Sequence, residues 1–303
     1  MFIRGMHGLG DNVHQRAIIR ELTKTHATVW LETSWPQLYH DLPVQCVSRH
    51  TPLRTQTKNA KRHQDSFCTH SAPVDLSIRY SPDQVRRSGS VLMAMAETAR
   101  VRGNLDFRFP VPTEWVEKAR SFIGDVTHPI LLYRPLVERK EWGGCRNRNP
   151  DPQTYVELFN LVRRGYYVIS VADLSPGEEW VVSGSVSPDL EFHHGELHFE
   201  VLAGLFKLAS LVWASPGFAI PLAQAIETPV VGVFGGYESP RSFSFGEKFA
   251  PHLWITPATV CECFSHTHQC QKWIDVPSWH SKLREFFDVA ASGFAGSASH
   301  QLG

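Results

Sequence analysis

Short apolar runs alternate along the whole chain with segments in which apolar residues recur every three or four positions. The apolar runs predict strands, and the segments with helical spacing predict amphipathic helices between them. The expected strands cover residues 2–6, 27–32, 43–48, 130–133, 166–172, 211–214, 230–234 and 253–255, and the expected helices cover residues 13–24, 83–99, 114–123, 151–164, 197–209, 218–227 and 278–290. Such alternation is typical of an α/β fold built on parallel sheets.

The pattern divides into two halves at a polar segment, residues 124–129, which we interpret as a linker. A chain of 303 residues is long enough for two α/β domains. We therefore expect two Rossmann-like, doubly wound domains facing a cleft. The first covers residues 1–125, the second covers residues 126–292, and residues 293–303 form a flexible tail.

The clearest local pattern is residues 211–236, which predict a strand, a loop, a helix and a second strand. Ser215, Pro216 and Gly217 interrupt the apolar run with turn-forming residues, and the helix is expected to begin at Phe218. The first N–H groups of a helix are unpaired and lie at the positive end of its dipole. Residues 217–219 are therefore a candidate cradle for a phosphate or diphosphate. The alternative is an ordinary βαβ unit without a ligand.

A glycine loop follows the first expected strand, with Gly8 and Gly10 ahead of Asp11 and Asn12. It lacks the third glycine of the dinucleotide-binding fingerprint. Asp11 is expected at the carboxyl edge of the sheet, where open α/β folds bind ligands. The alternative is that Asp11 only caps the following helix, and the frequency of aspartate at helix starts favours this interpretation when the loop is considered alone.

Composition restricts the classes of partner. The chain has 30 basic and 30 acidic residues, 42% hydrophobic residues and 20% charged residues, which is typical of a globular protein without an overall field for nucleic acid or membrane. Residues 49–108 are locally basic, with eleven Lys or Arg against five Asp or Glu. This segment either faces an anionic acceptor, such as a phosphorylated glycan or nucleic acid, or is a solvated surface. Six cysteines and the absence of a long apolar run predict a cytoplasmic protein without a membrane span.

Five potential metal ligands lie within ten residues near the end of the second half: Cys261, Cys263, His266, His268 and Cys270. Four of them could hold a structural zinc ion in a tetrahedral site. Their spacing differs from the paired C-x2-C arrangement of zinc fingers and ribbons. We therefore favour free thiols in a surface loop, with a zinc site or a reversible disulfide as alternatives.

Several of these blocks, in their order along the chain, resemble the heptosyltransferases of glycosyltransferase family 9. The family opens with GLGD and a helix that ends in R-x-L, and this chain has GLGD at 8–11 and REL at 20–22. Residues 211–235 resemble the family's C-terminal block of strand, GP, helix and TPVV. A basic loop at 146–150 ahead of the helical residues 155–158 is similar to the family's loop, and many members have a cysteine cluster like the one at 261–270.

The resemblance implies a GT-B fold, with the acceptor mainly on the first domain and a nucleotide diphosphate-sugar mainly on the second. It implies that Asp11 is the general base of an inverting transfer, with Gly8, Gly10 and Asn12 in the acceptor-side loop. The leaving diphosphate requires positive potential, which the helix start and nearby cations can supply. It also implies a reaction without a metal and without a cofactor beyond the nucleotide-sugar co-substrate. The expected donor-binding residues are Ser215, Pro216, Gly217, Phe218, Arg134, Arg139 and Lys140.

This sequence departs from the family at two donor-side positions. Ser215 stands where the family usually has an aspartate, and Ile220 stands where it often has a histidine. These departures leave the donor sugar open. A glycan or lipopolysaccharide-type acceptor follows from the resemblance. The alternatives are transfer to hydroxylated bases of DNA, a sugar-nucleotide epimerase, and a non-catalytic module that binds nucleotide-sugar or nucleic acid.

Overall fold

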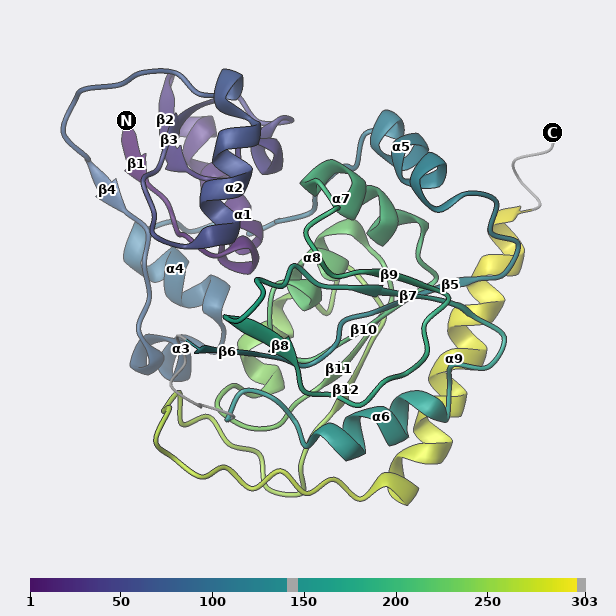
Figure 1. Cartoon of the computed structure of the whole chain (residues 1–303). Helices are drawn as coiled ribbons and strands as arrows, with labels where there is room; N and C mark the ends of the chain where they lie inside the picture. Colours follow the sequence, from purple (N-terminus) through teal and green to yellow (C-terminus); the bar gives the residue numbers. More distant parts are fainter. Residues whose placement is uncertain (141–146, 299–303) are drawn as a thin grey trace.

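The computed structural model describes residues 1–140 and 147–298 and contains two parallel sheets with helices around them (Figure 1). The first sheet has the strand order β3-β2-β1-β4. Its strands are β1 (Phe2–Arg4), β2 (Val29–Thr33), β3 (Val44–Ser48) and β4 (Leu76–Ser77). The second sheet has six parallel strands in the order β12-β11-β10-β5-β7-β9. They are β5 (Ile130–Tyr133), β7 (Tyr167–Val171), β9 (Leu190–Phe192), β10 (Leu211–Ala214), β11 (Val230–Val233) and β12 (His252–Ile255).

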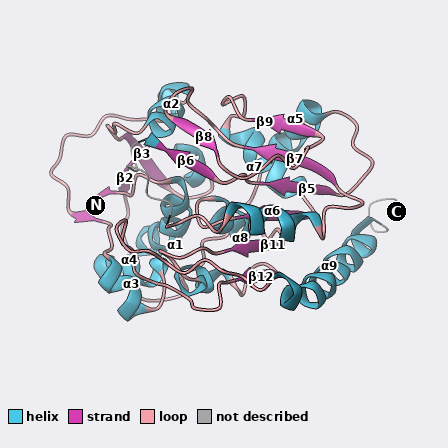
Figure 2. Ribbon diagram, turned by 60° about the horizontal axis from the view of Figure 1, so that its bottom comes forward, coloured by secondary structure: helices cyan, strands magenta, loops and turns pink. Residues whose placement is uncertain are grey.

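The strands of the second sheet bury both faces, as their apolar runs predict. Alternate residues of a strand point to opposite faces. In β5, Ile130 and Leu132 pack into the larger core beside α7 (Phe199–Leu208) and α8 (Ala219–Ile226). Leu131 and Tyr133 pack into a second core beside α6 (Pro152–Asn160) and α9 (Val276–Ala298). Figure 2 shows these helices on the two sides of the strands. The prediction of an α/β fold with two parallel-sheet units is confirmed.

The first half carries α1 (Leu9–Thr25), α2 (Arg54–Arg62), α3 (Pro82–Ser88), α4 (Val91–Ala99) and α5 (Thr113–Ile123), with short 3-10 turns η1 (Pro36–Tyr39) and η2 (Gln64–Ser66). A third 3-10 segment, η4 (Pro240–Gly246), lies in the second half. The expected single helix over 83–99 is wrong, because Gly89 adopts φ +96° and ends α3. The hydroxyl of Ser90 then accepts a hydrogen bond from the Met93 N–H and caps α4.

Two further expectations need correction. Residues 134–144 were expected to form a polar loop, but β6 (Val137–Arg139) pairs antiparallel with β8 (Glu179–Val181). The residues that follow, 141–146, lie outside the described part of the chain. The flexible tail was expected from residue 293, but α9 continues to Ala298. Residues 299–303 are not described.

The two halves share one continuous core. Buried residues of α1, of α4 and of the first sheet lie in the same hydrophobic cluster as buried residues of α7 and α8. The helix α5, which the boundary at 125 assigns to the first half, packs against α7 of the second. Gly204 of α7 permits this approach, since a Cβ there would lie 2.2 Å from the Trp115 carbonyl oxygen. The boundary at 125 itself stays a prediction.

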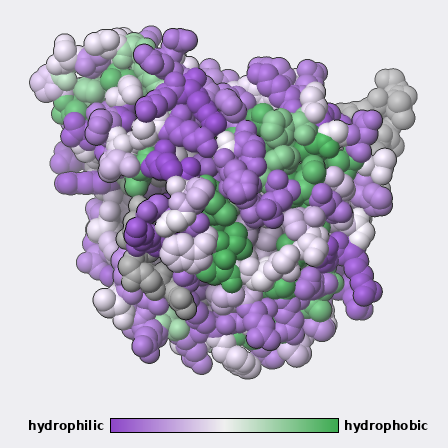
Figure 3. All heavy atoms as spheres, in the orientation of Figure 1, coloured by the Kyte–Doolittle hydropathy of each residue, from purple (hydrophilic) through white to green (hydrophobic). Residues whose placement is uncertain are grey.

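The face seen in Figure 3 is mainly hydrophilic, with hydrophobic residues in several separate groups. No helix in the described residues has the length and apolar character needed to cross a membrane.

Candidate functional site

A cavity of about 730 Å³ lies between the two halves, and both of the expected binding loops line it. It forms where the carboxyl ends of strands from both sheets face one another. In an open α/β sheet, ligands bind where neighbouring strands connect in opposite directions. That position lies between β1 and β4 in the first sheet and between β5 and β10 in the second. The expected site residues that line the cavity are Gly8, Gly10, Asp11, Arg134, Arg139, Ser215, Pro216, Gly217 and Phe218.

The donor-side residues follow the two central strands of the second sheet. Tyr133 and Trp213 are register partners at the ends of β5 and β10. The backbone N–H of Arg134 donates a 2.8 Å hydrogen bond to the Trp213 carbonyl oxygen, so the next residues emerge side by side. Arg134 and Ser215 therefore reach the same cavity although they are far apart in sequence.

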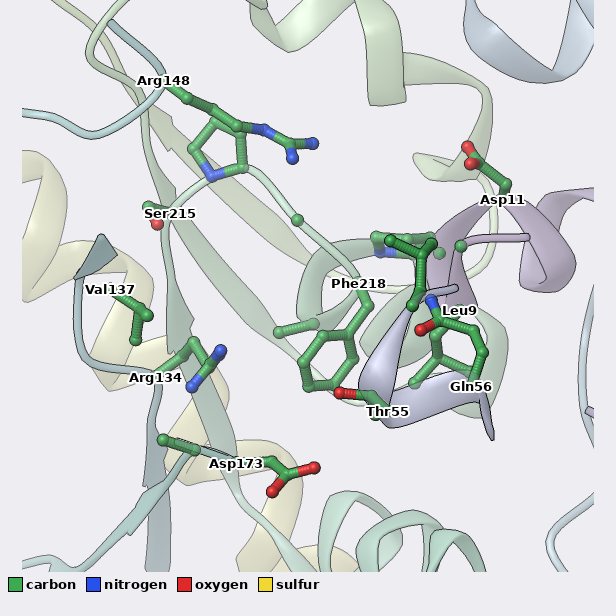
Figure 4. A pocket seen from close by; sticks show the side chains of 18 of the residues that line it. Leu9, Asp11, Thr55, Gln56, Arg134, Val137, Arg148, Asp173, Ser215 and Phe218 are labelled. Carbon is green, nitrogen blue, oxygen red and sulfur yellow. The ribbon is translucent and has the colours of Figure 1, made fainter. Parts of the chain in front are cut away.

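The helix α8 begins one residue later than expected, at Ala219, with Phe218 as its N-cap. No side chain caps this end, which faces the cavity. The Arg134 guanidinium lies 5.5 Å from the centre of the Phe218 ring. Figure 4 shows Phe218 between the Arg134 side of the cavity and the side that carries Leu9 and Asp11. Open N–H groups at a helix start beside an arginine can bind an anionic group.

The Arg134 guanidinium forms no ion pair with a carboxylate among the described side chains. Its Nη1 donates a 2.8 Å hydrogen bond to the Val171 carbonyl oxygen. The charges of Glu179 and Asp173 act on its pKa from a longer distance. Burial and the neighbouring Arg139 charge lower the pKa of Arg134 to about 10. Arg134 is still protonated at neutral pH and can bind an anion.

The two other expected cations differ in placement. Arg139 lines the cavity and lies 3.0 Å from a carboxylate oxygen of Glu179. Lys140 is exposed, pairs with Glu178 at 3.1 Å and is not among the residues that line the cavity. The structure therefore places Arg139 at the cavity and Lys140 outside it.

Asp11 lies in the first turn of α1 and is not its N-cap. The helix begins at Leu9, four residues earlier than expected, and Gly8 occupies the N-cap position without a side-chain hydrogen bond. The interpretation of Asp11 as the cap is therefore wrong. Its partly buried carboxylate lines the cavity and accepts a 3.1 Å hydrogen bond from the Tyr80 hydroxyl. Burial raises the pKa of Asp11 to about 6, against the lowering effects of the Tyr80 hydrogen bond and the Arg148 charge.

Three residues that the sequence did not single out complete this side of the cavity: Tyr80, Arg148 and Glu238. Tyr80 follows β4, the edge strand beside β1, so these two neighbouring strands of the first sheet both contribute to the site. Arg148 donates from Nε to Glu238 at 2.6 Å and from Nη2 at 3.1 Å. Burial opposes the charge on Arg148, but the Glu238 pair outweighs it and the net pKa of Arg148 is raised. The basic loop at 146–150 was the available signal for Arg148.

The remaining residues of the glycine loop have structural roles. Gly10 lies in α1 where that helix meets α8, and a Cβ at Gly10 would lie 3.1 Å from the Phe218 Cα. Asn12 is fully buried, and its Nδ2 donates 2.8 Å hydrogen bonds to the carbonyl oxygens of Met6 and Gly8. Asn12 therefore holds the loop in shape and does not line the cavity.

The basic segment connects the two halves beside the cavity. From α2, Arg54 pairs with Asp173 at 3.1 Å and with Glu179 at 2.8 Å. Lys58 pairs with Asp173 at 3.3 Å and donates a 3.0 Å hydrogen bond to the Gly195 carbonyl oxygen. These cations are therefore partly neutralised by acids of the second half.

The cysteine and histidine residues near the end of the second half come together in space, with one exception. Ligand atoms of Cys261, Cys263, His268 and Cys270 all lie within 4.8 Å of one another. His266 lies outside this group, with its ring 5.3 Å from the ring of Tyr237.

Comparisons with known proteins identify the architecture. No family model matches this chain, and no curated protein matches it in sequence. The solved structure of the ADP-heptose lps heptosyltransferase II of E. coli is similar with a TM-score of 0.61 and 11% identity, over 94% of this chain and 97% of that chain. The iron-containing dodecameric glycosyltransferase TibC from E. coli H10407 matches with a TM-score of 0.61 and 13% identity, over 97% and 79%. A glycosyltransferase of family 9 from Veillonella parvula matches with a TM-score of 0.55 and 11% identity, over 84% of each chain. This chain thus has the GT-B fold of these glycosyltransferases, as the order of its sequence blocks predicted.

Proposed function

We propose that this protein is an inverting glycosyltransferase that moves a sugar from a nucleotide diphosphate-sugar to a hydroxyl group of a glycan. One observation carries the proposal. Asp11 lines the same cavity as Arg134 and the uncapped start of α8, so a carboxylate base and an anion site share one space. The fold is that of enzymes that use such donors, since one solved relative is a heptosyltransferase in complex with ADP-D-beta-D-heptose.

In the proposed reaction, the acceptor hydroxyl oxygen forms a bond to the anomeric carbon of the donor sugar. The bond between that carbon and the diphosphate oxygen breaks, and its electron pair leaves with the diphosphate. Asp11 accepts the hydroxyl proton. A pKa of about 6 suits this role, because Asp11 is mostly ionised at neutral pH and is still basic enough to take a proton.

The second requirement of the reaction is that the negative charge on the leaving diphosphate is stabilised. The N–H groups at the start of α8 and the guanidinium groups of Arg134 and Arg139 can stabilise it. These protein groups supply the positive potential that metal ions provide in other transferases, which supports a metal-independent transfer. The donor-side position at Ser215 offers a hydroxyl where the resembling family usually offers a carboxylate, so we leave the donor sugar open within the class of nucleotide diphosphate-sugars.

A glycan acceptor is favoured over DNA. Three of the cations in the basic segment, Arg54, Lys58 and Arg62 of α2, are engaged with Asp173, Glu179 and the Gly195 carbonyl oxygen. A nucleic-acid surface requires cations that are available to phosphates. We also expect the reaction to take place in the cytoplasm, since the described cysteines form no disulfide, as in proteins of reducing compartments.

The proposal is tested by adding nucleotides and nucleotide-sugars singly to the purified protein and measuring Tm. A ligand that binds only the folded state raises Tm, and we expect a selective rise with one nucleoside diphosphate and its sugars. The selected donor is then incubated with hydroxylated glycan acceptors, and release of the nucleoside diphosphate is followed. Asp11→Asn should keep the rise in Tm. Its turnover should fall by about 100-fold or more, as expected for loss of a general base. A rise in Tm with DNA and with no nucleotide would contradict the proposal.

A further inference from the structure

Four side chains of one loop meet at a single point outside the cavity. Cys261, Cys263, His268 and Cys270 lie in a C-x-C-x4-H-x-C pattern between β12 and α9. The three cysteines are partly buried, and His268 is at the surface. All four ligand atoms lie within 4.8 Å of one another. Three soft sulfur ligands and one imidazole are a donor set that favours zinc.

The distances within this cluster fit a tetrahedral metal site. His268 Nδ1 lies 3.6 Å from the Cys261 sulfur and 3.4 Å from the Cys270 sulfur. The sulfurs of Cys263 and Cys270 are 3.5 Å apart. A tetrahedral zinc ion, with bonds of about 2.3 Å to sulfur and about 2.1 Å to nitrogen, separates two sulfurs by about 3.8 Å and sulfur from nitrogen by about 3.6 Å. A disulfide would require sulfurs about 2.0 Å apart.

The backbone of the loop is shaped around the sulfur atoms. Phe264 adopts φ +50°, a left-handed conformation that is uncommon for a residue other than glycine. This turn lets the N–H of Ser265 donate a 3.4 Å hydrogen bond to the Cys263 sulfur. A thiolate is a better acceptor of such a bond than a thiol. The turn and the N–H to sulfur bond therefore hold Cys263 in place within the cluster.

We propose that Cys261, Cys263, His268 and Cys270 bind one zinc ion as a structural site. Four protein ligands complete the tetrahedral coordination and leave no open position for substrate, so this ion is structural and takes no part in bond transfer. The proposal goes beyond the transfer reaction and stands independently of it. It replaces the expectation of free thiols in this loop.

The position of the site explains why this chain would use a metal there. The Nδ2 of Asn147 donates to the carbonyl oxygens of Ser265, at 2.9 Å, and of His266 and His268. The Phe264 N–H donates a 3.0 Å hydrogen bond to the Tyr237 carbonyl oxygen. The loop therefore holds both segments that carry the Arg148–Glu238 pair of the cavity.

Gly236 shows how closely the loop is packed against one of these segments. A Cβ at Gly236, which has φ +127°, would lie 2.3 Å from the Cys270 Cβ. We infer that the zinc ion fixes the loop, and that the loop fixes the two segments beside Asp11. Loss of zinc should therefore lower the stability of the protein and weaken the positioning of Arg148. The positions of Asp11 and α8 should not change, because neither is joined to this loop by a hydrogen bond or ion pair among the described residues.

The test is the metal content of the full-length protein, purified without a histidine tag and measured by elemental mass spectrometry. We expect about one zinc ion per chain in the wild type. His268→Ala and Cys263→Ser should lose zinc and melt at lower temperature. His266→Ala is the matched control from the same loop, and Cys68→Ser is a control cysteine outside the cluster. Both should retain one zinc ion.

A variant that fails to fold would not decide the question, so the wild type is also examined directly. Removal of zinc by a chelator followed by cobalt should give the thiolate-to-cobalt absorption of a tetrahedral site, and His266→Ala should give the same spectrum. Wild-type protein that binds neither ion after incubation with excess metal would overturn the proposal. A disulfide between Cys263 and Cys270 in freshly prepared protein would overturn it as well, and one iron per chain without zinc would overturn the assignment of zinc.

Discussion

The Tyr80 hydroxyl donates a 3.1 Å hydrogen bond to Oδ1 of Asp11, across 69 residues of sequence. The two residues follow β4 and β1, which are neighbours in the first sheet, with β4 at its edge. The hydrogen bond favours the ionised carboxylate and opposes the effect of burial on its pKa. Tyr80 therefore acts on the reaction through Asp11, as a positioning residue that also sets its basicity.

Tyr80→Phe should move the acid limb of the pH profile. In the wild type, kcat/KM should fall as the pH drops through about 6, because Asp11 becomes protonated. Removing the hydroxyl raises the pKa of Asp11, and we expect the acid limb to shift upward by about one pH unit. Turnover at pH 6 should then fall several-fold, while turnover at pH 8 changes little. An acid limb at the same pH in both proteins would show that this hydrogen bond does not control the base.

Asp11→Asn should make the folded protein more stable at high pH. The pKa of Asp11 is raised in the folded state to about 6, so folding stability is lost as the pH rises from about 4 through about 6. Asparagine has no charge to bury, and it can still accept the Tyr80 hydrogen bond. The free energy of unfolding should exceed that of the wild type by about 1–3 kcal/mol at pH 8 and by little at pH 4.

Chemical denaturation at the two pH values measures this difference. The exposed Asp125 provides the control, since Asp125→Asn should leave the free energy of unfolding close to the wild-type value at both pH values. If Asp11→Asn were no more stable than the wild type at pH 8, the carboxylate would not be held at a cost in stability.

The sequence predicted well that residues after β5 and β10 lie together at the cavity, because that arrangement depends on local order. The strand Leu211–Ala214 has the expected bounds, since a buried apolar run ends at turn-forming residues. Its neighbour β5 also matches, and the residues after both strands meet because parallel strands share one carboxyl edge. Arg134 and Ser215 could therefore be assigned to one site from the sequence.

The side of the cavity that carries Asp11 depends on tertiary contacts and was predicted less well. Gly8 and Gly10 are helix-breaking residues by propensity, so the start of α1 was placed at residue 13. In the structure Gly10 is accepted inside the helix because it lets α1 approach Phe218 of the other half. Tyr80 and Glu238 lie in loops without a local motif, and only the assembled fold brings them to Asp11. The three-residue strands β6 and β8 are too short to show a period.

Arg134→Ala should weaken binding of the nucleoside diphosphate by about 10–100-fold, the expected effect of losing charge-assisted hydrogen bonds to a phosphate. Lys140→Ala is the matched control, because Lys140 is equally cationic but exposed and outside the cavity. Its affinity should stay within about two-fold of the wild type. Isothermal calorimetry with the nucleotide found by the Tm screen measures both variants. Equal losses in the two variants would mean that the diphosphate binds elsewhere or through general charge.

The packing of α5 on α7 gives a test of how the two halves are joined. A Cβ at Gly204 would lie 2.2 Å from the Trp115 carbonyl oxygen and 2.8 Å from the Ala119 Cβ. Backbone atoms cannot move aside as a flexible side chain does, so Gly204→Ala must push α5 away from α7. We expect a loss of about 1–3 kcal/mol in the free energy of unfolding, as for other overpacked cores.

Gly184→Ala is the control for the intrinsic effect of replacing glycine, since a Cβ at Gly184 would have no atom within 4 Å. That variant should change the free energy of unfolding by less than about 0.5 kcal/mol. Urea denaturation measures both. If Gly204→Ala were as harmless as Gly184→Ala, then α5 would belong to the first half alone and would be free to move relative to α7. A selective loss at Gly204 would mean that α5 is part of the second half, and that the cavity is closed by a helix the linker boundary assigns to the other domain.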